Sequence, residues 1–103
     1  MRKAKVYMHD KLAGTLIEFE KNQRYGFSYL EAYEGPAISL TMPATQKDYE
    51  FTAFPPFFDG LLPEGFQLEA LLRKRKIDRN DLFSQLIIVG QDLVGAVTVA
   101  EEK

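Results

Sequence analysis

The stretch that decides the fold is Tyr25-Gly-Phe-Ser-Tyr-Leu30, in which aromatic residues alternate with small ones. Its three rings, Tyr25, Phe27 and Tyr29, fall on one face of an extended chain, and the residues between them fall on the other. Side chains in a β-strand point to opposite faces with a period of two residues. The alternation therefore predicts a strand.

Three further strands are predicted in this half of the chain. Val6 and Met8 lead into the polar turn His9-Asp10-Lys11, and the apolar segment Leu12–Phe19 follows, which is the pattern of a β-hairpin. The fourth strand is expected after Gly35-Pro36, where alternation resumes. Ile38, Leu40 and Met42 alternate there with Ser39 and Thr41, and Pro43 ends the strand because proline has no N–H for the ladder.

The second half of the chain changes to helical spacing. Leu68, Leu71 and Leu72 share one face of a helix of about three turns. The basic residues Arg73–Lys76 follow at its C-terminal end, where the helix dipole favours cations. Asn80 is placed to cap a second helix, which has apolar residues at Leu82, Phe83, Leu86, Ile87 and Val89.

Gly90 is expected to end that second helix, and Gly95–Ala100 has the pattern of a closing strand. Strands first, helices next and a strand last predict an α+β fold. We expect one domain over residues 1–103, with a mainly antiparallel sheet and two to three helices packed on one side of it.

Composition excludes several classes of protein. The 103 residues include no cysteine, which excludes disulfides and thiolate chemistry and suits a reducing cytoplasm. The longest apolar run, Leu86–Gly90, is far shorter than the roughly 20 residues that span a bilayer. A formal net charge of -2 does not draw the chain to nucleic acid or to an anionic membrane. We therefore expect a cytoplasmic protein that contacts neither directly.

No set of residues has the spacing that catalysis requires. His9 is the only histidine and stands in a predicted turn, and carboxylate pairs such as Glu18 with Glu20 lie on polar strand faces. Neither of the glycine-rich phosphate-binding motifs occurs. The sequence thus predicts a protein that is not an enzyme and that needs no cofactor or metal.

The segment Phe54–Phe66 is unusually apolar for a connection, because it holds four of the eight phenylalanines. We expect most of its apolar side chains to fill the space between the sheet and the helices. These are Phe57, Phe58, Leu61 and Leu62.

Phe66 differs from them. At about 100° per residue, a helix that includes it would place its ring opposite Leu61, Leu68 and Leu72. A solvent-facing ring is a candidate binding anchor, because it buries a large area at little entropic cost. Alternatively, Gly65 breaks the helix and turns the ring inward. The candidate partner-binding residues are Pro63, Glu64, Gly65 and Phe66.

The same segment carries a resemblance to a known family. Phe57-Phe-Asp-Gly-Leu-Leu-Pro-Glu-Gly65 is similar to the F-F-x-x-L-L-P-E-G signature of the N-terminal subdomain of HipA-type kinases. Shorter motifs of the family occur in the same order, at Leu12–Leu16, Phe27–Tyr29, Ile38–Pro43, Asn80–Leu86, Gly90–Asp92 and Gly95–Val97. The resemblance thus covers nearly the whole chain, but the ATP-binding loop and the catalytic and metal-binding aspartates of those kinases have no counterpart in it.

Within this family the chain most resembles the HipS type, the small stand-alone component of tripartite HipBST toxin–antitoxin systems. The resemblance implies an antitoxin that binds and inhibits a HipT-like serine/threonine kinase, with a HipB-like DNA-binding protein as a second possible partner. The Pro63–Phe66 corner would face the nucleotide cleft of the kinase. The alternative is an isolated N-terminal subdomain of a HipA-type kinase, with a structural and HipB-contacting role and no inhibitory activity. A third alternative is a single-stranded nucleic-acid binder that uses Arg73–Arg79.

Overall fold

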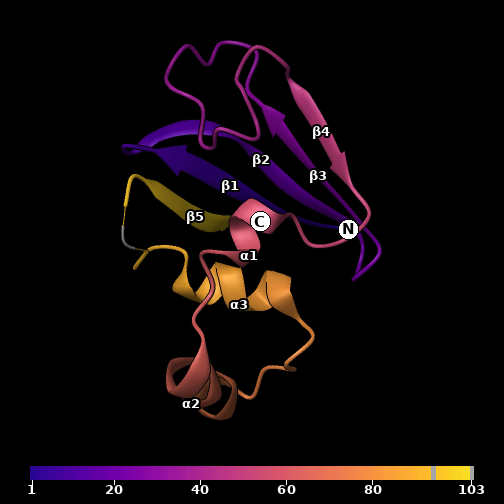
Figure 1. Ribbon diagram of the computed structural model, residues 1–103, viewed down its shortest axis with the longest axis vertical. Coiled ribbons are helices and arrows are strands. Elements are labelled where there is room, and N and C mark those ends of the chain that lie inside the picture. Colours follow the sequence, from indigo (N-terminus) through magenta and orange to yellow (C-terminus); the bar gives the residue numbers. More distant parts are fainter. Residues whose placement is uncertain (94, 103) are drawn as a thin grey trace.

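Five strands form one antiparallel sheet in the computed structural model of the chain, which describes residues 1–93 and 95–102 (Figure 1). In chain order they are β1 (Arg2–Met8), β2 (Lys11–Glu20), β3 (Arg24–Tyr29), β4 (Asp48–Phe51) and β5 (Val97–Glu102). Their order across the sheet is β4-β3-β2-β1-β5. The predicted hairpin between β1 and β2 is confirmed. Its turn residues His9 and Asp10 have φ of 49° and 67°, as tight two-residue turns require.

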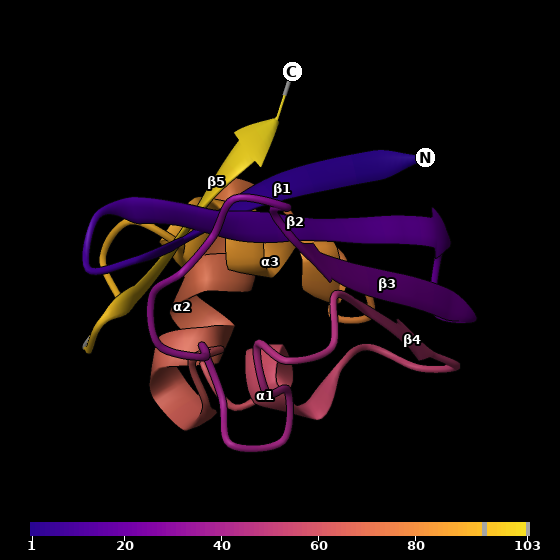
Figure 2. The same cartoon turned by 90° about the horizontal axis from the view of Figure 1, so that it is seen from above.

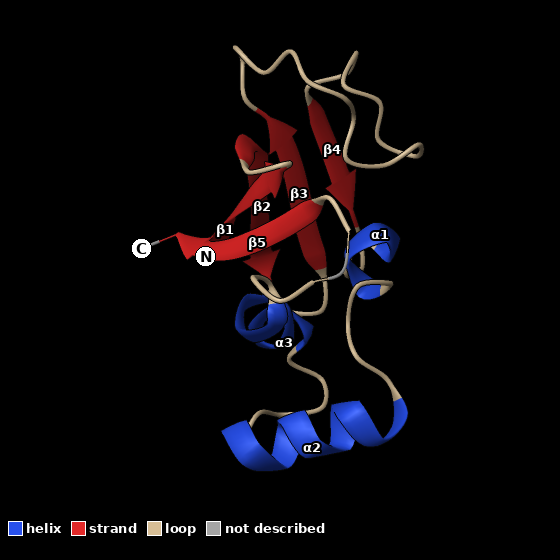
Figure 3. Ribbon diagram, turned by 90° about the vertical axis from the view of Figure 1, so that its left-hand side faces the viewer, coloured by secondary structure: helices blue, strands red, loops and turns tan. Residues whose placement is uncertain are grey.

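Three helices lie between β4 and β5 in the described part of the chain: α1 (Pro56–Asp59), α2 (Gly65–Arg75) and α3 (Leu82–Val89). All three lie on the same side of the sheet (Figure 2). Helices α1 and α3 are next to the sheet, whereas α2 lies beyond them at the far end of the molecule (Figure 3). The α+β class and the one-sided placement of the helices are confirmed.

The prediction of the fourth strand was wrong. Residues 38–42 form a tight turn closed by a bridge between Ser39 and Met42, and the fourth strand is Asp48–Phe51. Ile38 and Met42 are buried, but Leu40 is 99 % exposed, so the three residues do not share one face of a strand. The hydroxyl of Tyr29 explains the turn, because it accepts a hydrogen bond from the N–H of Ile38 and donates one to the carbonyl of Met42.

The core fills the space between the sheet and helices α1 and α3. Phe27 on β3 and Phe58 on α1 are both fully buried, and their ring centroids lie 5.9 Å apart. Phe57 is half-buried and lies edge to face against Phe58. Leu61 and Leu62 are half-buried against the same cluster. These four residues therefore pack where the sequence placed them.

A charged cluster fastens α3 to the sheet. The guanidinium of Arg2 on β1 donates to both carboxylate oxygens of Glu18 on β2, at 2.6 and 3.0 Å. It also donates to the carboxylate of Asp81 and to the hydroxyl of Ser84, both at 2.8 Å. A second contact comes from Phe83, whose ring centroid lies 4.9 Å from the guanidinium carbon. One cation thus joins two strands to the start of α3.

Asp81 has two roles in that cluster. Besides pairing with Arg2, it is the N-cap of α3 and accepts a hydrogen bond from the backbone N–H of Ser84 at 3.2 Å. The predicted cap, Asn80, was therefore wrong by one position. Burial by itself raises the pKa of Asp81, but the hydrogen bonds from Arg2 and Ser84 outweigh it, so the pKa is lowered overall. The hydrogen bond to Glu18 raises the pKa of Arg2.

Gly90 ends α3 as predicted, but for a different reason. Its backbone is right-handed helical, with φ of -57° and ψ of -27°, so no left-handed conformation demands glycine. A Cβ at this position would lie 2.2 Å from the carbonyl oxygen of Val99. The N–H of Val99 donates to the carbonyl of Gly90 at 2.9 Å. Glycine lets the end of α3 approach β5 this closely.

Replacing Phe58 with alanine should cost roughly 3–5 kcal/mol of unfolding free energy, because it leaves a cavity in the only core of the domain. For a domain of this size, we expect the melting temperature to fall by more than about 10 °C. The matched control is Phe66→Ala, the same substitution at a ring that is 94 % exposed. Equal melting temperatures for the two variants, measured by circular dichroism, would contradict this account of the core.

Replacing Asp81 with asparagine tests the charged cluster through its pH dependence. The pKa of Asp81 is lower in the folded state, so its stabilising effect is present above the unfolded pKa of about 4 and is lost as the pH falls through the folded pKa. Asp81→Asn should therefore cost about 1 kcal/mol at pH 7, and the difference from wild type should shrink below about pH 4. Asp59→Asn, at an exposed carboxylate, is the control. A pH-independent difference would rule out charge pairing as the cause.

Candidate functional site

The sharp corner between α1 and α2 is built by Pro63, Glu64 and Gly65. Pro63 is half-buried, and Glu64 is exposed, extended, and the N-cap of α2. The side chain of Glu64 makes no capping hydrogen bond, so its carboxylate is free to face solvent. Gly65 has φ of 58°, in the left-handed region that glycine adopts most easily. No atom lies within 4 Å of where its Cβ would be, so glycine is required by the turn and not by crowding.

Phe66 is 94 % exposed at the start of α2. The outward orientation inferred from helical spacing is confirmed, and Gly65 does not turn the ring inward. One part of that inference was wrong: α2 begins at Gly65, so Leu61 lies outside the helix and is no reference for its faces. Leu68 and Leu72 are half-buried and lie about 120–160° from Phe66 around the axis. The ring therefore stands alone on the solvent side.

A hollow of about 410 Å³ adjoins the corner. Its walls include Leu61, Leu62 and Pro63 from the α1–α2 connection, Gln67 from α2, and Val89 and Leu93 from the end of α3 and the residues that follow it. Val89 and Leu93 were not predicted to lie at this site. They lie more than 20 residues farther along the chain, and no local pattern connects them with the corner.

The basic residues at the other end of α2 are separate from Phe66. Arg73, Lys74 and Arg75 are exposed in the last turn. Arg79 forms an ion pair with Glu69 on α2, which offsets part of the positive charge. Seven residues of helix, or about 10 Å, separate Phe66 from Arg73. Base stacking along a nucleic-acid strand would require aromatic rings interleaved with the cations, and the ring of Phe66 is not interleaved with them.

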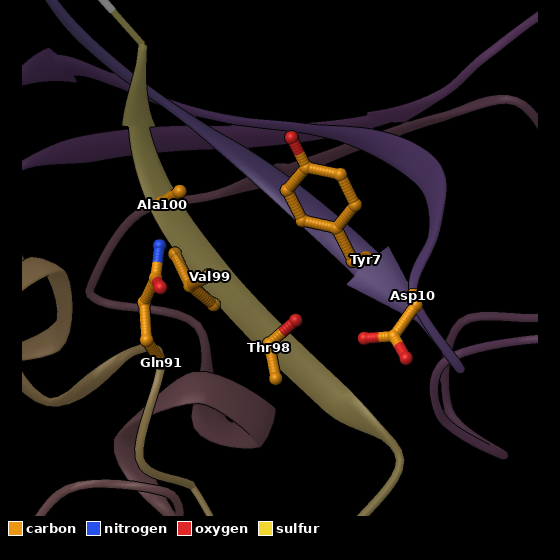
Figure 4. A pocket seen from close by; sticks show the side chains of 6 residues that line it. All are labelled: Tyr7, Asp10, Gln91, Thr98, Val99 and Ala100. Carbon is orange, nitrogen blue, oxygen red and sulfur yellow. The ribbon is translucent and has the colours of Figure 1, made fainter.

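A second hollow, of about 290 Å³, lies along β5 (Figure 4). Figure 4 shows that the Tyr7 hydroxyl points away from the Asp10 carboxylate, and that Gln91 lies on the other side of the β5 ribbon. Acid–base catalysis requires polar groups that converge on one point, and these groups do not.

In residues 1–93 and 95–102, no three potential metal ligands cluster. None of the helices in this range is long and apolar enough to cross a membrane.

Comparison with known proteins identifies the family of the chain and agrees with its fold. Residues 4–100 match the family model described as the HipA N-terminal domain. The chain belongs to this family. An uncharacterized protein of Haemophilus influenzae is 32 % identical over 103 residues, which cover 100 % of this chain and 95 % of the relative. A solved structure described as the N-terminal domain of HipA toxin matches with a TM-score of 0.79 and 28 % identity, over 100 % of this chain and 94 % of that one.

ATP should not bind to the purified chain at micromolar concentration. The sequence has no phosphate-binding loop, and the polar side chains at the hollow along β5 do not converge on one point, whereas the groups of a phosphate site do. Isothermal titration calorimetry with Mg-ATP should give only heats of dilution. The control is a HipA-type kinase titrated under the same conditions. Saturable micromolar binding to this chain would overturn the prediction.

Proposed function

We propose that this HipA N-terminal domain protein binds a HipT-like serine/threonine kinase toxin and inhibits it as an antitoxin. The family relationship supports a role connected with toxin–antitoxin systems. The observation that carries the proposal is the 94 % exposure of Phe66 at a corner whose backbone is otherwise fixed. Exposure of a large apolar ring to water is unfavourable. A protein partner that covers the ring gains the free energy of burying its apolar surface.

The structure of the corner favours a rigid anchor. Pro63 restricts the backbone before it, and Phe66 itself lies in the first turn of an 11-residue helix. Little conformational entropy is lost when such a ring enters a pocket, which raises affinity for a given contact area. The free carboxylate of Glu64 stands two residues away and supplies a charge that can pair with a cation of the kinase. The corner would thus insert into the nucleotide cleft and prevent its closure.

The HipS-type interpretation is supported by the length of the Haemophilus influenzae relative. Since this chain accounts for 95 % of that protein, the relative consists almost wholly of the same domain. A second interpretation is an N-terminal subdomain with a structural and HipB-contacting role, favoured by the match to the N-terminal domain of a HipA toxin. The two differ in one measurable property. Only an antitoxin suppresses the toxicity of a separate kinase that is expressed with it.

Substituting Phe66 tests the proposal directly. Growth rescue from a cognate HipT-like kinase should fail with Phe66→Ala, and the purified complex should weaken by roughly 30-fold to 1,000-fold, since a central aromatic anchor contributes about 2–4 kcal/mol. The melting temperature should change little because the ring is 94 % exposed. Binding is measured by calorimetry and toxicity by colony counts.

Two controls make the result specific to the corner. Leu40→Ala removes another fully exposed apolar side chain, in the loop between β3 and β4, and should leave binding unchanged. The double variant Arg73→Ala/Lys74→Ala removes exposed charges, which usually contribute less than about 1 kcal/mol. If rescue survives Phe66→Ala but fails in the basic double variant, recognition is electrostatic and the corner is not the anchor.

A further inference from the structure

The outer face of the sheet has no helix covering it. All three helices lie on the opposite, inner face (Figure 2). Because side chains alternate along each strand, the residues between the core residues of β1 to β4 share this outer face. Ile17 and Thr15 on β2 are half-buried there, and Lys3 on β1 is exposed. The face therefore has uncharged residues at its centre, among them the apolar Ile17, and charged residues toward its margins.

Strand register arranges this face in two parallel rows. One row contains Lys3, Ile17, Gly26 and Glu50, on β1, β2, β3 and β4 in turn. The next row contains Lys5, Thr15, Ser28 and Asp48 on the same four strands. On β1 to β4 each row thus has a lysine at one side and a carboxylate at the other, and β5 continues the rows beyond the lysines, with Ala100 beside Lys5 and Glu102 beside Lys3. Lys5 and Asp48 are three strands, or about 14 Å, apart, too far to pair within one molecule.

We propose that this face binds a second copy of the chain, related by a two-fold axis that runs parallel to the strands between β2 and β3. Such a rotation exchanges β1 with β4 and β2 with β3, and it lays each row on the same row of the second copy. Lys5 then faces Asp48 of the partner subunit, and Lys3 faces the partner subunit's Glu50. Every lysine meets a carboxylate, so the face is complementary to itself, as a two-fold interface must be.

Side-chain size is complementary under the same rotation. Ile17 faces Gly26 of the partner subunit, and Thr15 faces the partner subunit's Ser28. Gly26 lies in a hollow of about 280 Å³ whose walls include Ile17, Phe19 and Glu50. The ring of Phe19 covers the glycine, since a Cβ on Gly26 would lie 2.8 Å from it. The branched side chain of one copy therefore meets an apolar floor in the other.

The dimensions of the face indicate a weak dimer. Four strands about 4.8 Å apart, with about three outward residues along each of the longer strands, give a flat area of roughly 400 Å². A standard stable interface buries about 800 Å² on each partner. Association should therefore be visible only at high protein concentration. It should also weaken with salt, because exposed charge pairs are screened.

Analytical ultracentrifugation of the full chain over a concentration series, at low and at high salt, measures this association. Wild type should show a monomer–dimer equilibrium at low salt. Lys5→Glu and Asp48→Lys should each weaken it at least about tenfold, because each variant brings two like charges together at both ends of the interface. Mixed in equal amounts, the two variants should associate with each other at least as well as wild type does. In that heterodimer every row again pairs opposite charges.

The mixing experiment separates a direct contact from a general effect of charge. Lys21→Glu, at an exposed lysine in the turn after β2, is the control and should not change association. Thermal melts confirm that each variant folds, and Lys3→Glu with Glu50→Lys form a second pair if one of the first does not. A wild-type chain that stays monomeric, or single variants whose mixture fails to associate, would overturn the proposal.

Outcomes for the kinase-binding corner and for this face are distinguishable. Phe66→Ala should leave self-association unchanged, because Phe66 lies on α2, on the helix side of the sheet (Figure 3). If Lys5→Glu weakens the kinase complex while the chain alone remains monomeric, the outer face binds the kinase and the second-copy proposal is wrong. The proposed antitoxin role would survive that result.

Discussion

The contact of Phe58 with the rings of the inner sheet face decides the path of the chain after β4. Helix α1 has only four residues and cannot be stable by itself, because isolated short helices are marginal in water. Its position depends on Phe58, which is fully buried 5.9 Å from the ring of Phe27. The residues that follow, Leu61 and Leu62, are already half-buried, and the chain emerges from the core at Pro63. The exposure of Phe66 is thus a consequence of where Phe58 is held.

Helix α3 is fixed to the sheet at both of its ends. Asp81 binds Arg2 at its start, and the carbonyl of Gly90, just beyond its last residue, accepts a backbone hydrogen bond from the N–H of Val99. Helix α2 lies between these two anchored elements and has no fully buried residue of its own. Stability is not uniform across a fold, and elements with little buried apolar surface open first. The helix that carries the exposed ring is therefore held mainly by its connections, so the position of Phe66 depends on the corner at Pro63–Gly65 and not on packing of α2 against the core.

Sequence reasoning located the parts of this fold whose cause is local. Strands β1 to β3 follow from the alternation of single residues, and the exposure of Phe66 follows from helical spacing. It failed where the cause is distant in the chain. The turn at residues 38–42 depends on two hydrogen bonds of the Tyr29 hydroxyl, and no residue pattern near Ile38 or Met42 predicts them.

The same limit applies to the charged cluster and to the hollow beside the corner. Arg2 and Asp81 are 79 residues apart, so their pairing depends on the completed fold. Asn80 and Asp81 are equally good caps by residue type, and the contact with Arg2 favours the second. Val89 reaches the corner only because α3 packs on the sheet. Local sequence patterns predict most strands and helices and the exposed position of Phe66. Surfaces that several elements form together depend on how the elements pack, so local patterns do not predict them.

The two proposed surfaces lie on opposite sides of the same core. The outer face is formed by β1 to β4, and Phe66 projects from α2, which lies farthest from the sheet on the helix side (Figure 3). A dimer formed through the outer faces would therefore leave both copies of Phe66 uncovered and directed away from each other. Self-association through the outer faces would thus not compete with the proposed binding of a kinase at the corner.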